Sequence, residues 1–395
     1  MRVNPIGFLN LQNKKLSQTK SDNTKFAKIA DTTIAFVASR KKSKPTFKGI
    51  LGKTSLVTGG AGYIGSHTAK YLLEKGYDVV VLDNLSLGNN GAIRQLGKIA
   101  SDWGSKFKFY LGDIADSKLV SKIFRENDVD GVIHFAAFSQ VGESVQNPLK
   151  YYANNTGKTT ELLREMLDAK VNKIVFSSTA ATYGNPAKIP IQELDPQIPI
   201  NPYGASKLMI ERIMDDAGQA EGLKSTRLRY FNAAGASTDG MLGEVHEPET
   251  HLIPNILKAA HSKQNGGSQV QTFKLFGTDY PTKDGTCVRD YIHVEDLASA
   301  HELAMQRLFK GGDTSFYNLG SGEGYSVKEV FDASKKITGV DIPIQELGRR
   351  AGDPPTLLAD NSKARAELGW VPQKSLDDMV TSAWNWELKP MFVRG

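Results

Sequence analysis

The stretch TGGAGYIGSH, from Thr58 to His67, decides the fold. It follows the apolar run TSLVT and leads directly into a helical pattern, with Gly59, Gly62 and Gly65 in a G-x-x-G-x-x-G arrangement. Glycines at these places allow a tight turn and let the backbone approach a pyrophosphate at the positive end of a helix. The stretch therefore predicts a strand, a phosphate-binding turn and a helix in succession.

Similar apolar runs recur from Lys53 to Tyr230: DVVVLD, FKFYLGD, GVIHFAA, KIVFSS and STRLRYFN. Strands this apolar, separated by helix-length segments, are typical of a parallel sheet that is covered on both faces. We therefore predict an α/β fold: a Rossmann-like, doubly wound parallel sheet over residues 53–230. Residues 231–395 predict a smaller mixed α/β domain for the substrate, with a helix near 250–262 and a strand at 271–276. Some of its segments can return to the first domain.

The acidic residue Asp83 ends the second predicted strand. A carboxylate in this position can accept hydrogen bonds from both hydroxyls of an adenosine ribose. A glycine-rich turn alone is weak evidence, but strand, turn, helix and acid together predict a dinucleotide site. Asp83 favours NAD over NADP, because a 2′-phosphate would meet a like charge.

Polar and small residues follow three further strands, in Gly112-Asp113-Ile114, His134-Phe135-Ala136-Ala137 and Ser177-Ser178-Thr179. The carboxyl ends of strands in an open parallel sheet form its ligand crevice, so we expect all three segments to lie over one dinucleotide. We assign Asp113 and Phe135 to the cofactor and His134 to packing.

The heptapeptide NPYGASK places Tyr203 and Lys207 four residues apart at a predicted helix start, so both side chains share one face. A free tyrosine has a pKa near ~10 and is a poor base at neutral pH. Lowering that pKa by ~3 units requires about 4 kcal/mol, which two nearby cations can supply. Thr179 offers a hydroxyl that can donate to and accept from a reacting oxygen. These three residues form a candidate proton-transfer set.

The formal net charge of +6 suggests nucleic-acid binding only until the charge is located. Twelve Lys or Arg residues stand against Asp22 and Asp31 in residues 1–53, and the rest of the chain carries 37 basic and 41 acidic residues. We therefore predict a basic, disordered extension over residues 1–50 and no nucleic-acid partner. The extension is equally compatible with an organelle transit peptide. The chain has one cysteine and no long apolar run, so we expect a soluble, cytoplasmic protein with no membrane contact.

The motifs TGGAGYIGSH, Y-x-x-x-K, RYFNAAG and GTDYPTKDGTCVRDYIHVEDL together resemble the extended short-chain dehydrogenase/reductase family, and within it the UDP-hexose 4-epimerases. The resemblance spans residues 52–387. It implies NAD contacts by the glycines named above and by Tyr63, Ile64, Asp83, Asn84, Asp113, Ile114, Phe135, Ala136, Ala137, Asn154, Ser177, Tyr203, Lys207 and Tyr230. It implies UDP-sugar contacts by Thr179, Tyr203, Asn232, Leu252, Phe276, Arg289, Arg350, Asp353 and Leu357. Ser139 and His251 depart from some members, where lysine and asparagine stand.

The resemblance also implies the reaction. Tyr203 takes the proton of the sugar 4-hydroxyl while the C4 hydride passes to NAD, Lys207 steadies the phenolate, and the resulting 4-keto sugar turns over before it is reduced again. UDP-galactose and UDP-glucose would thus interconvert within a homodimer, and no metal is expected. Alternatives are a 4-epimerase for N-acetyl sugars or UDP-xylose, a dehydratase or decarboxylase, and a non-catalytic NAD-binding protein. Ala180 and Ala181 stand where a dehydratase would carry an acid.

Overall fold

The computed structural model describes residues 34–36, 52–266, 270–350 and 353–393. Its main sheet has eight strands, of which seven are parallel and β1 alone is antiparallel. In sheet order the strands are β1 (Ile34–Phe36), β4 (Phe107–Leu111), β3 (Asp78–Asp83), β2 (Thr54–Thr58), β5 (Gly131–His134), β6 (Lys173–Thr179), β7 (Lys224–Tyr230) and β11 (Ser315–Leu319). The doubly wound α/β fold predicted from the sequence is confirmed.

The order of the strands reverses at the centre of the sheet. From β2 the chain adds β3 and β4 on one side, and then returns to place β5, β6 and β7 on the other. The helices that follow β2 and β5 diverge there, so a crevice forms beyond the carboxyl ends of these two strands. The glycine-rich turn after β2 and the segment after β5 therefore face each other across this crevice.

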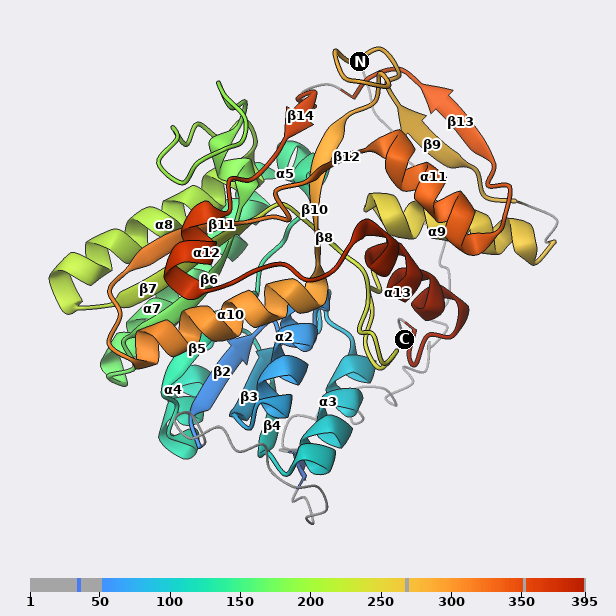
Figure 1. Ribbon diagram of the computed structural model, residues 1–395. Coiled ribbons are helices and arrows are strands. Elements are labelled where there is room, and N and C mark those ends of the chain that lie inside the picture. Colours follow the sequence, from blue (N-terminus) through green and yellow to red (C-terminus); the bar gives the residue numbers. More distant parts are fainter. Residues whose placement is uncertain (1–33, 37–51, 267–269, 351–352, 394–395) are drawn as a thin grey trace, which may run out of the picture. The chain divides into compact units, whose positions relative to one another are not determined.

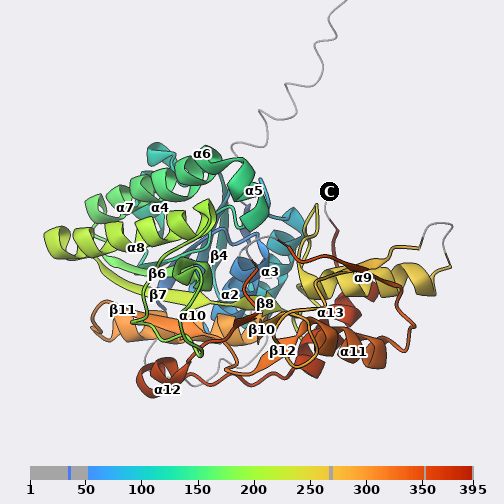
Figure 2. The ribbon, with the colours of Figure 1, turned by 90° about the horizontal axis from the view of Figure 1, so that it is seen from above.

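Helices cover both faces of the sheet (Figures 1 and 2). On one face lie α2 (Tyr63–Glu74), α3 (Asn90–Trp103), α10 (Val294–Phe309) and α12 (Ser362–Leu368). On the other lie α4 (Ser117–Asn127), α7 (Lys158–Asp168) and α8 (Pro202–Glu221). Successive residues of β2 serve the two faces, because Val57 packs in the first core and Leu56 in the second. Both are wholly buried, which explains why the centre of the strand is apolar.

Between β5 and α7 the chain forms short helical segments beside α8 (Figure 2). These are α5 (Val141–Gln146), α6 (Pro148–Tyr151) and the π-helical turn η1 (Tyr152–Gly157). A single 3-10 turn, η2 (Ala180–Tyr183), follows β6.

The rest of the chain forms smaller sheets with helices packed on them. Its strands are β8 (Asn232–Ala234), β9 (Phe273–Phe276), β10 (Val288–His293), β12 (Gly324–Ser326), β13 (Ile344–Leu347) and β14 (Thr356–Leu357). Its helices are α9 (Leu252–Gln264), α11 (Val327–Thr338) and α13 (Leu376–Leu388). Phe273, Phe331 and Trp384 share the hydrophobic core of this part. The helix and strand predicted near 250–262 and 271–276 are confirmed by α9 and β9.

The predicted boundaries of the sheet domain and of the N-terminal extension can be compared with the structure. β11, α10 and α12 come from beyond residue 230 and join the main sheet, as the sequence analysis allowed. The extension predicted over residues 1–50 lies outside the described residues, except that residues 34–36 form β1, which was not predicted. Within the described residues, no helix combines the length and apolarity needed to cross a membrane.

A buried ion pair fixes α8 on the sheet. Arg229 of β7 donates from Nε and Nη2 to the carboxylate of Glu211 on α8, at 3.0 and 2.5 Å, and the two side chains are 3% and 2% exposed. Ser178 of β6 donates to the same carboxylate. Because this pair has no water to replace a lost partner, it holds the helix at one place on the sheet.

Replacing Arg229 by methionine should lower the free energy of unfolding by about 3–5 kcal/mol, because Glu211 would remain buried and unpaired. The double variant Arg229→Met/Glu211→Leu should regain part of that loss. Arg212→Met is the matched control, since its partner Asp216 lies 3.4 Å away on the surface of the same helix, and should cost less than about 1 kcal/mol. Urea unfolding followed by circular dichroism measures all three. Equal losses for Arg229→Met and Arg212→Met would contradict the assignment.

Candidate active site

The glycine-rich turn joins β2 to the start of α2. Gly59 has a φ of +72°, and a Cβ there would lie 2.6 Å from the backbone nitrogen of Ala136, just after the neighbouring strand β5. A Cβ at Gly65 would lie 2.2 Å from the Gly59 carbonyl oxygen. The helix begins with Gly62 as N-cap, without a side-chain cap and without an acidic residue in its first turn. The positive end of α2 is therefore open to an anion.

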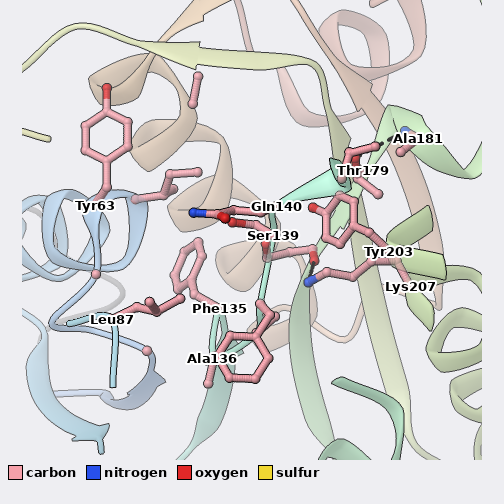
Figure 3. Close-up of a pocket in the computed structure, with 18 of the residues that line it drawn as sticks. Tyr63, Leu87, Phe135, Ala136, Ser139, Gln140, Thr179, Ala181, Tyr203 and Lys207 are labelled. Carbon is pink, nitrogen blue, oxygen red and sulfur yellow. Dashed lines mark hydrogen bonds between the residues drawn. The ribbon is translucent and has the colours of Figure 1, made fainter. Parts of the chain in front are cut away.

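A cavity of about 650 Å³ runs along the carboxyl ends of the strands (Figure 3). Every residue predicted to contact the cofactor lines it: the three glycines of the turn, Tyr63, Ile64, Asp83, Asn84, Asp113, Ile114, Phe135, Ala136, Ala137, Asn154, Ser177, Tyr203, Lys207 and Tyr230. The structure thus brings together residues that are up to 171 positions apart because their strands end at one edge.

Two carboxylates lie on this wall in different surroundings. Asp83 is buried and accepts from the backbone nitrogens of Ala61 and Leu85, at 3.0 and 2.8 Å, while burial raises its pKa. Burial alone would raise the pKa of Asp113, but hydrogen bonds from Lys158 at 2.6 Å, the Ala115 nitrogen and Asn84 together outweigh it and lower that pKa. Both acids are held in fixed orientations by their donors.

Helix α8 presents Tyr203 and Lys207 to the cavity from its first two turns. It is capped by Asn201, whose side chain accepts from the Gly204 nitrogen at 2.9 Å. Lys207 Nζ donates to the Ser177 carbonyl oxygen at 2.8 Å, and its burial lowers its pKa to about 7 although Glu211 opposes this. In Figure 3 the Tyr203 ring points toward Thr179.

Tyr203 is held as a neutral phenol in this environment. Burial raises its pKa, and a hydrogen bond with Thr179 only partly offsets this. Lys207 Nζ donates to the Ser177 carbonyl oxygen, and the lowering of the Tyr203 pKa by two nearby cations stays a prediction. Positive charge beside the phenolic oxygen is thus what the site needs to make Tyr203 a base.

The residues predicted to bind the sugar nucleotide divide into two sets. Those lining the cavity are Thr179, Tyr203, Asn232, Arg289, Arg350, Asp353 and Leu357. Leu252 instead packs on the hydrophobic core around α9. Phe276 is not among the lining residues, and its ring lies 3.9 Å beneath the Arg350 guanidinium. The roles of these two side chains in ligand binding stay predictions.

Other lining residues escaped the sequence analysis as site residues. Lys158 pairs with Asp113, and Gln140 lies beside Ser139 in Figure 3. Both residues lie in the stretch from the end of β5 to the start of α7, and this position after a strand end is the signal that could have identified them. Glu244 and His246 also reach the wall, together with His251. They lie on an irregular loop, where no periodicity points to them.

Comparisons with known proteins agree with this geometry. Residues 56–383 match the family model described as GDP-mannose 4,6 dehydratase. A UDP-glucose 4-epimerase of Lactobacillus helveticus is 52% identical over 332 residues, covering 84% of this chain and 96% of the relative. The Brucella ovis UDP-glucose 4-epimerase structure in complex with NAD has a TM-score of 0.77 and 45% identity, covering 84% and 97%. That of Bifidobacterium longum, with NAD+ and UDP, has a TM-score of 0.79 and 43% identity, covering 86% and 99%.

This chain belongs to the UDP-glucose 4-epimerase family. The membership applies to the folded body, because the matched region begins at residue 56.

In this epimerase-family chain, Gly65→Ala should remove bound nucleotide and destabilise the fold, because the new methyl group would force the Gly59 carbonyl away and open the turn. We expect a loss of about 1–3 kcal/mol and at least a tenfold lower nucleotide content after purification. Gly348→Ala is the control, since its Cβ would meet nothing within 4 Å and the residue does not line the cavity. Denaturant unfolding and an enzymatic nucleotide assay measure the two effects. A normal nucleotide content in Gly65→Ala would contradict a phosphate-binding turn.

Proposed function

We infer that this chain is an isomerase that interconverts UDP-galactose and UDP-glucose through a 4-keto sugar, with NAD as its cofactor. The observation that carries the inference is the placement of Tyr203, Lys207 and Thr179 at one cavity with the open end of α2. About half of the aligned residues are identical to those of curated UDP-glucose 4-epimerases, which supports the same function.

The residues of the cavity fit NAD. The open α2 terminus suits the pyrophosphate, since helix termini favour anions, and the glycines leave room for it. Asp83 suits the hydroxyls of the adenosine ribose. When bound, NAD accepts the hydride from C4 of the sugar and later returns it, so no net oxidation results.

Proton transfer falls to Tyr203. Its phenolic oxygen accepts the proton of the sugar 4-hydroxyl, and it returns that proton when C4 is reduced again. Thr179 hydrogen-bonds the phenolic oxygen and holds it in place. Lys207, four residues further along α8, supplies positive charge once its side-chain amine is protonated.

Two arginines suit the UDP end of the substrate. Arg289 of β10 donates to the Val288 and Pro354 carbonyl oxygens at 2.9 and 2.8 Å, and its guanidinium lies 3.6 Å from Asp353. Arg350 stacks on Phe276. Guanidinium groups bind phosphate oxygens in pairs, so these fixed arginines can hold the diphosphate while the sugar turns.

Epimerisation fits the site better than dehydration. A dehydratase needs an acid beside the threonine, and Ala180 and Ala181 occupy the cavity wall at that point. The Thr179 hydroxyl accepts a hydrogen bond from the Ala181 backbone nitrogen at 3.1 Å, which holds the two alanines in a tight turn directly after the threonine. A non-catalytic NAD-binding role is not favoured, because the Tyr and Lys pair is retained and buried.

Tyr203→Phe should lower kcat for UDP-galactose by about 10²–10⁴-fold while UDP still binds, because only the phenolic oxygen is removed. Tyr71→Phe is the control, since it removes a hydroxyl from α2 outside the lining residues, and should leave kcat within twofold. Steady-state kinetics and UDP titration measure both. A Tyr203→Phe variant that kept a tenth of the normal rate would show that another group is the base.

The range of sugars should depend on Leu357. This residue lies on β14 beside Arg289 and lines the cavity. A structural relative is the UDP-Glc/GlcNAc 4-epimerase of Campylobacter jejuni, with a TM-score of 0.72, 45% identity and coverage of 86% and 100%. We propose efficient turnover of UDP-glucose and UDP-galactose and weak turnover of the N-acetyl forms.

Leu357→Tyr should suppress activity on UDP-N-acetylgalactosamine further, because a filled pocket rejects the bulky group, and Leu357→Ala should raise it. We expect the ratio of kcat/KM for UDP-galactose and the N-acetyl sugar to change by about 10-fold or more between the two variants. Leu358→Ala is the control for altered packing on the same segment. A ratio that stays constant across the series would mean that Leu357 does not face the sugar.

We also propose a homodimer built on α5, α6 and α8. These neighbouring helices expose Val145, Leu149 and Met209, of which Leu149 is 79% exposed. Leu149→Asp should give a monomer of 43.2 kDa in light scattering, whereas Leu194→Asp, at a loop leucine that is 88% exposed, should not. A monomeric parent protein would contradict the proposal.

A cytoplasmic location remains our proposal, with which the single buried cysteine, Cys287, agrees.

A further inference from the structure

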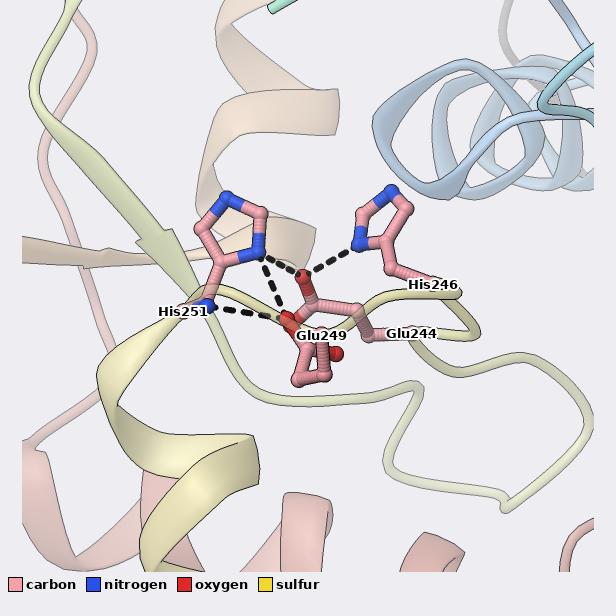
Figure 4. A group of neighbouring side chains, drawn as sticks. All are labelled: Glu244, His246, Glu249 and His251. Atoms are coloured by element: carbon pink, nitrogen blue, oxygen red, sulfur yellow. Dashed lines mark hydrogen bonds and ion pairs between the residues drawn. The ribbon is translucent and has the colours of Figure 1, made fainter. Parts of the chain in front are cut away.

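Four side chains with metal-ligating groups converge at one edge of the cavity (Figure 4). They are Glu244 and His246 on the loop after β8, and Glu249 and His251 just before α9, where His251 is the N-cap. One ligand atom from each residue lies within 4.8 Å of all the others. Among the residues that the structure describes, this is a compact set of two imidazoles and two carboxylates.

Distances within the cluster are close to those between the ligands of a small cation. Glu244 Oε1 lies 2.9 Å from His246 Nδ1 and 2.7 Å from His251 Nδ1, and Glu249 Oε1 lies 3.0 Å from His251 Nδ1. Zinc binds imidazole nitrogen and carboxylate oxygen at about 2.0–2.2 Å. Four such ligands in a tetrahedron lie about 3.3 Å apart. To admit the ion, the three close pairs must move apart by a few tenths of an ångström, and the wider pairs, which lie within 4.8 Å, must move closer together.

The charge of the cluster favours a divalent cation. The side chains of Glu244 and Glu249 are only 7% and 4% exposed, so two carboxylates are withdrawn from water side by side. A divalent ion bound through two neutral imidazoles cancels the charge of both carboxylates, which would otherwise lie side by side away from water.

An ion has a route to the cluster and space beside it. Glu244, His246 and His251 are part of the wall of the large cavity. Glu244 and Glu249 also line a second cavity of about 30 Å³, next to Trp386 and Lys258. That volume exceeds the ~10–15 Å³ that a single water molecule requires, so an ion could keep a water ligand there.

We propose that Glu244, His246, Glu249 and His251 bind one zinc ion, which ties the loop after β8 to the start of α9 at the edge of the substrate cavity. Two nitrogen and two oxygen ligands suit Zn²⁺ better than Mg²⁺, which prefers oxygen and keeps its waters. The imidazoles bind zinc in their neutral form, and no redox change occurs.

The sequence analysis expected no metal, and these four residues lie in the irregular stretch GEVHEPETH. The inference does not depend on the proposed epimerase activity, since it rests only on the geometry of the loop.

Metal binding by the full chain tests the proposal without any assay of turnover. Protein treated with EDTA and then freed of it is titrated with ZnCl₂ in a calorimeter, and retained zinc is measured after gel filtration. We expect one zinc per chain, a Kd at or below about 10 μM, and a Tm higher by roughly 2–5 °C with excess zinc. Excess MgCl₂ should not compete.

Cobalt provides a readout that requires no variant. Co²⁺ in a four-coordinate site absorbs strongly in the visible, whereas six-coordinate Co²⁺ absorbs weakly, so we expect strong bands that zinc abolishes. The proposal would be overturned if the calorimeter showed no zinc binding, if no zinc remained after gel filtration, or if cobalt gave only the weak six-coordinate spectrum.

Variants locate the ion. Glu249→Gln keeps the volume of the side chain and should weaken zinc binding at least tenfold, and His246→Ala/His251→Ala should abolish it. His261→Ala is the matched control, because His261 on α9 also pairs with a glutamate, at 3.0 Å from Glu387, but lies outside the cluster. Equal zinc binding by the double variant and the control would place the ion elsewhere and overturn the proposal.

Discussion

The ion pair between Arg229 and Glu211 is the contact on which the arrangement of the site depends. It joins β7 to α8 in the interior, and Ser178 joins β6 to the same carboxylate. Arg229 also donates to the Glu193 carbonyl oxygen and to the Tyr183 hydroxyl, at 3.0 and 2.9 Å, which holds the segment between β6 and α8. Tyr203 and Lys207 sit two turns and one turn before Glu211 on this helix, so their distance from the strand ends is fixed by the same contact.

Burial works against both ionised forms that the chemistry requires. It raises the pKa of Tyr203 and lowers that of Lys207 to about 7, so the isolated site favours a neutral phenol and a lysine that is only partly charged. A charged ligand changes this balance, because interactions between charges are stronger where water is excluded. The residues are therefore positioned by the fold, and their protonation states depend on what fills the cavity.

Local sequence patterns were sufficient for the central parts of this structure. The glycine turn, the apolar strands and the pair Tyr203 and Lys207 each have a spacing with one physical meaning, and all appear where predicted. β11 and α10 could not be assigned to the main sheet, because their neighbours lie far away in the sequence. Leu252 packs beside the core around α9 and Phe276 stacks on Arg350, and contacts of this kind are not encoded in any sequence spacing. Glu244 and His251 are brought together by the course of an irregular loop, which no sequence pattern predicts.

In the proposed reaction, C4 of the sugar loses and regains the same hydrogen. The direct measurement is conversion of UDP-glucose carrying deuterium at C4, in ordinary water, followed by mass spectrometry and NMR of the product. We expect UDP-galactose that retains the deuterium at C4 through many turnovers. Replacement of that deuterium by hydrogen from the solvent, or the absence of any UDP-galactose, would contradict the proposed reaction.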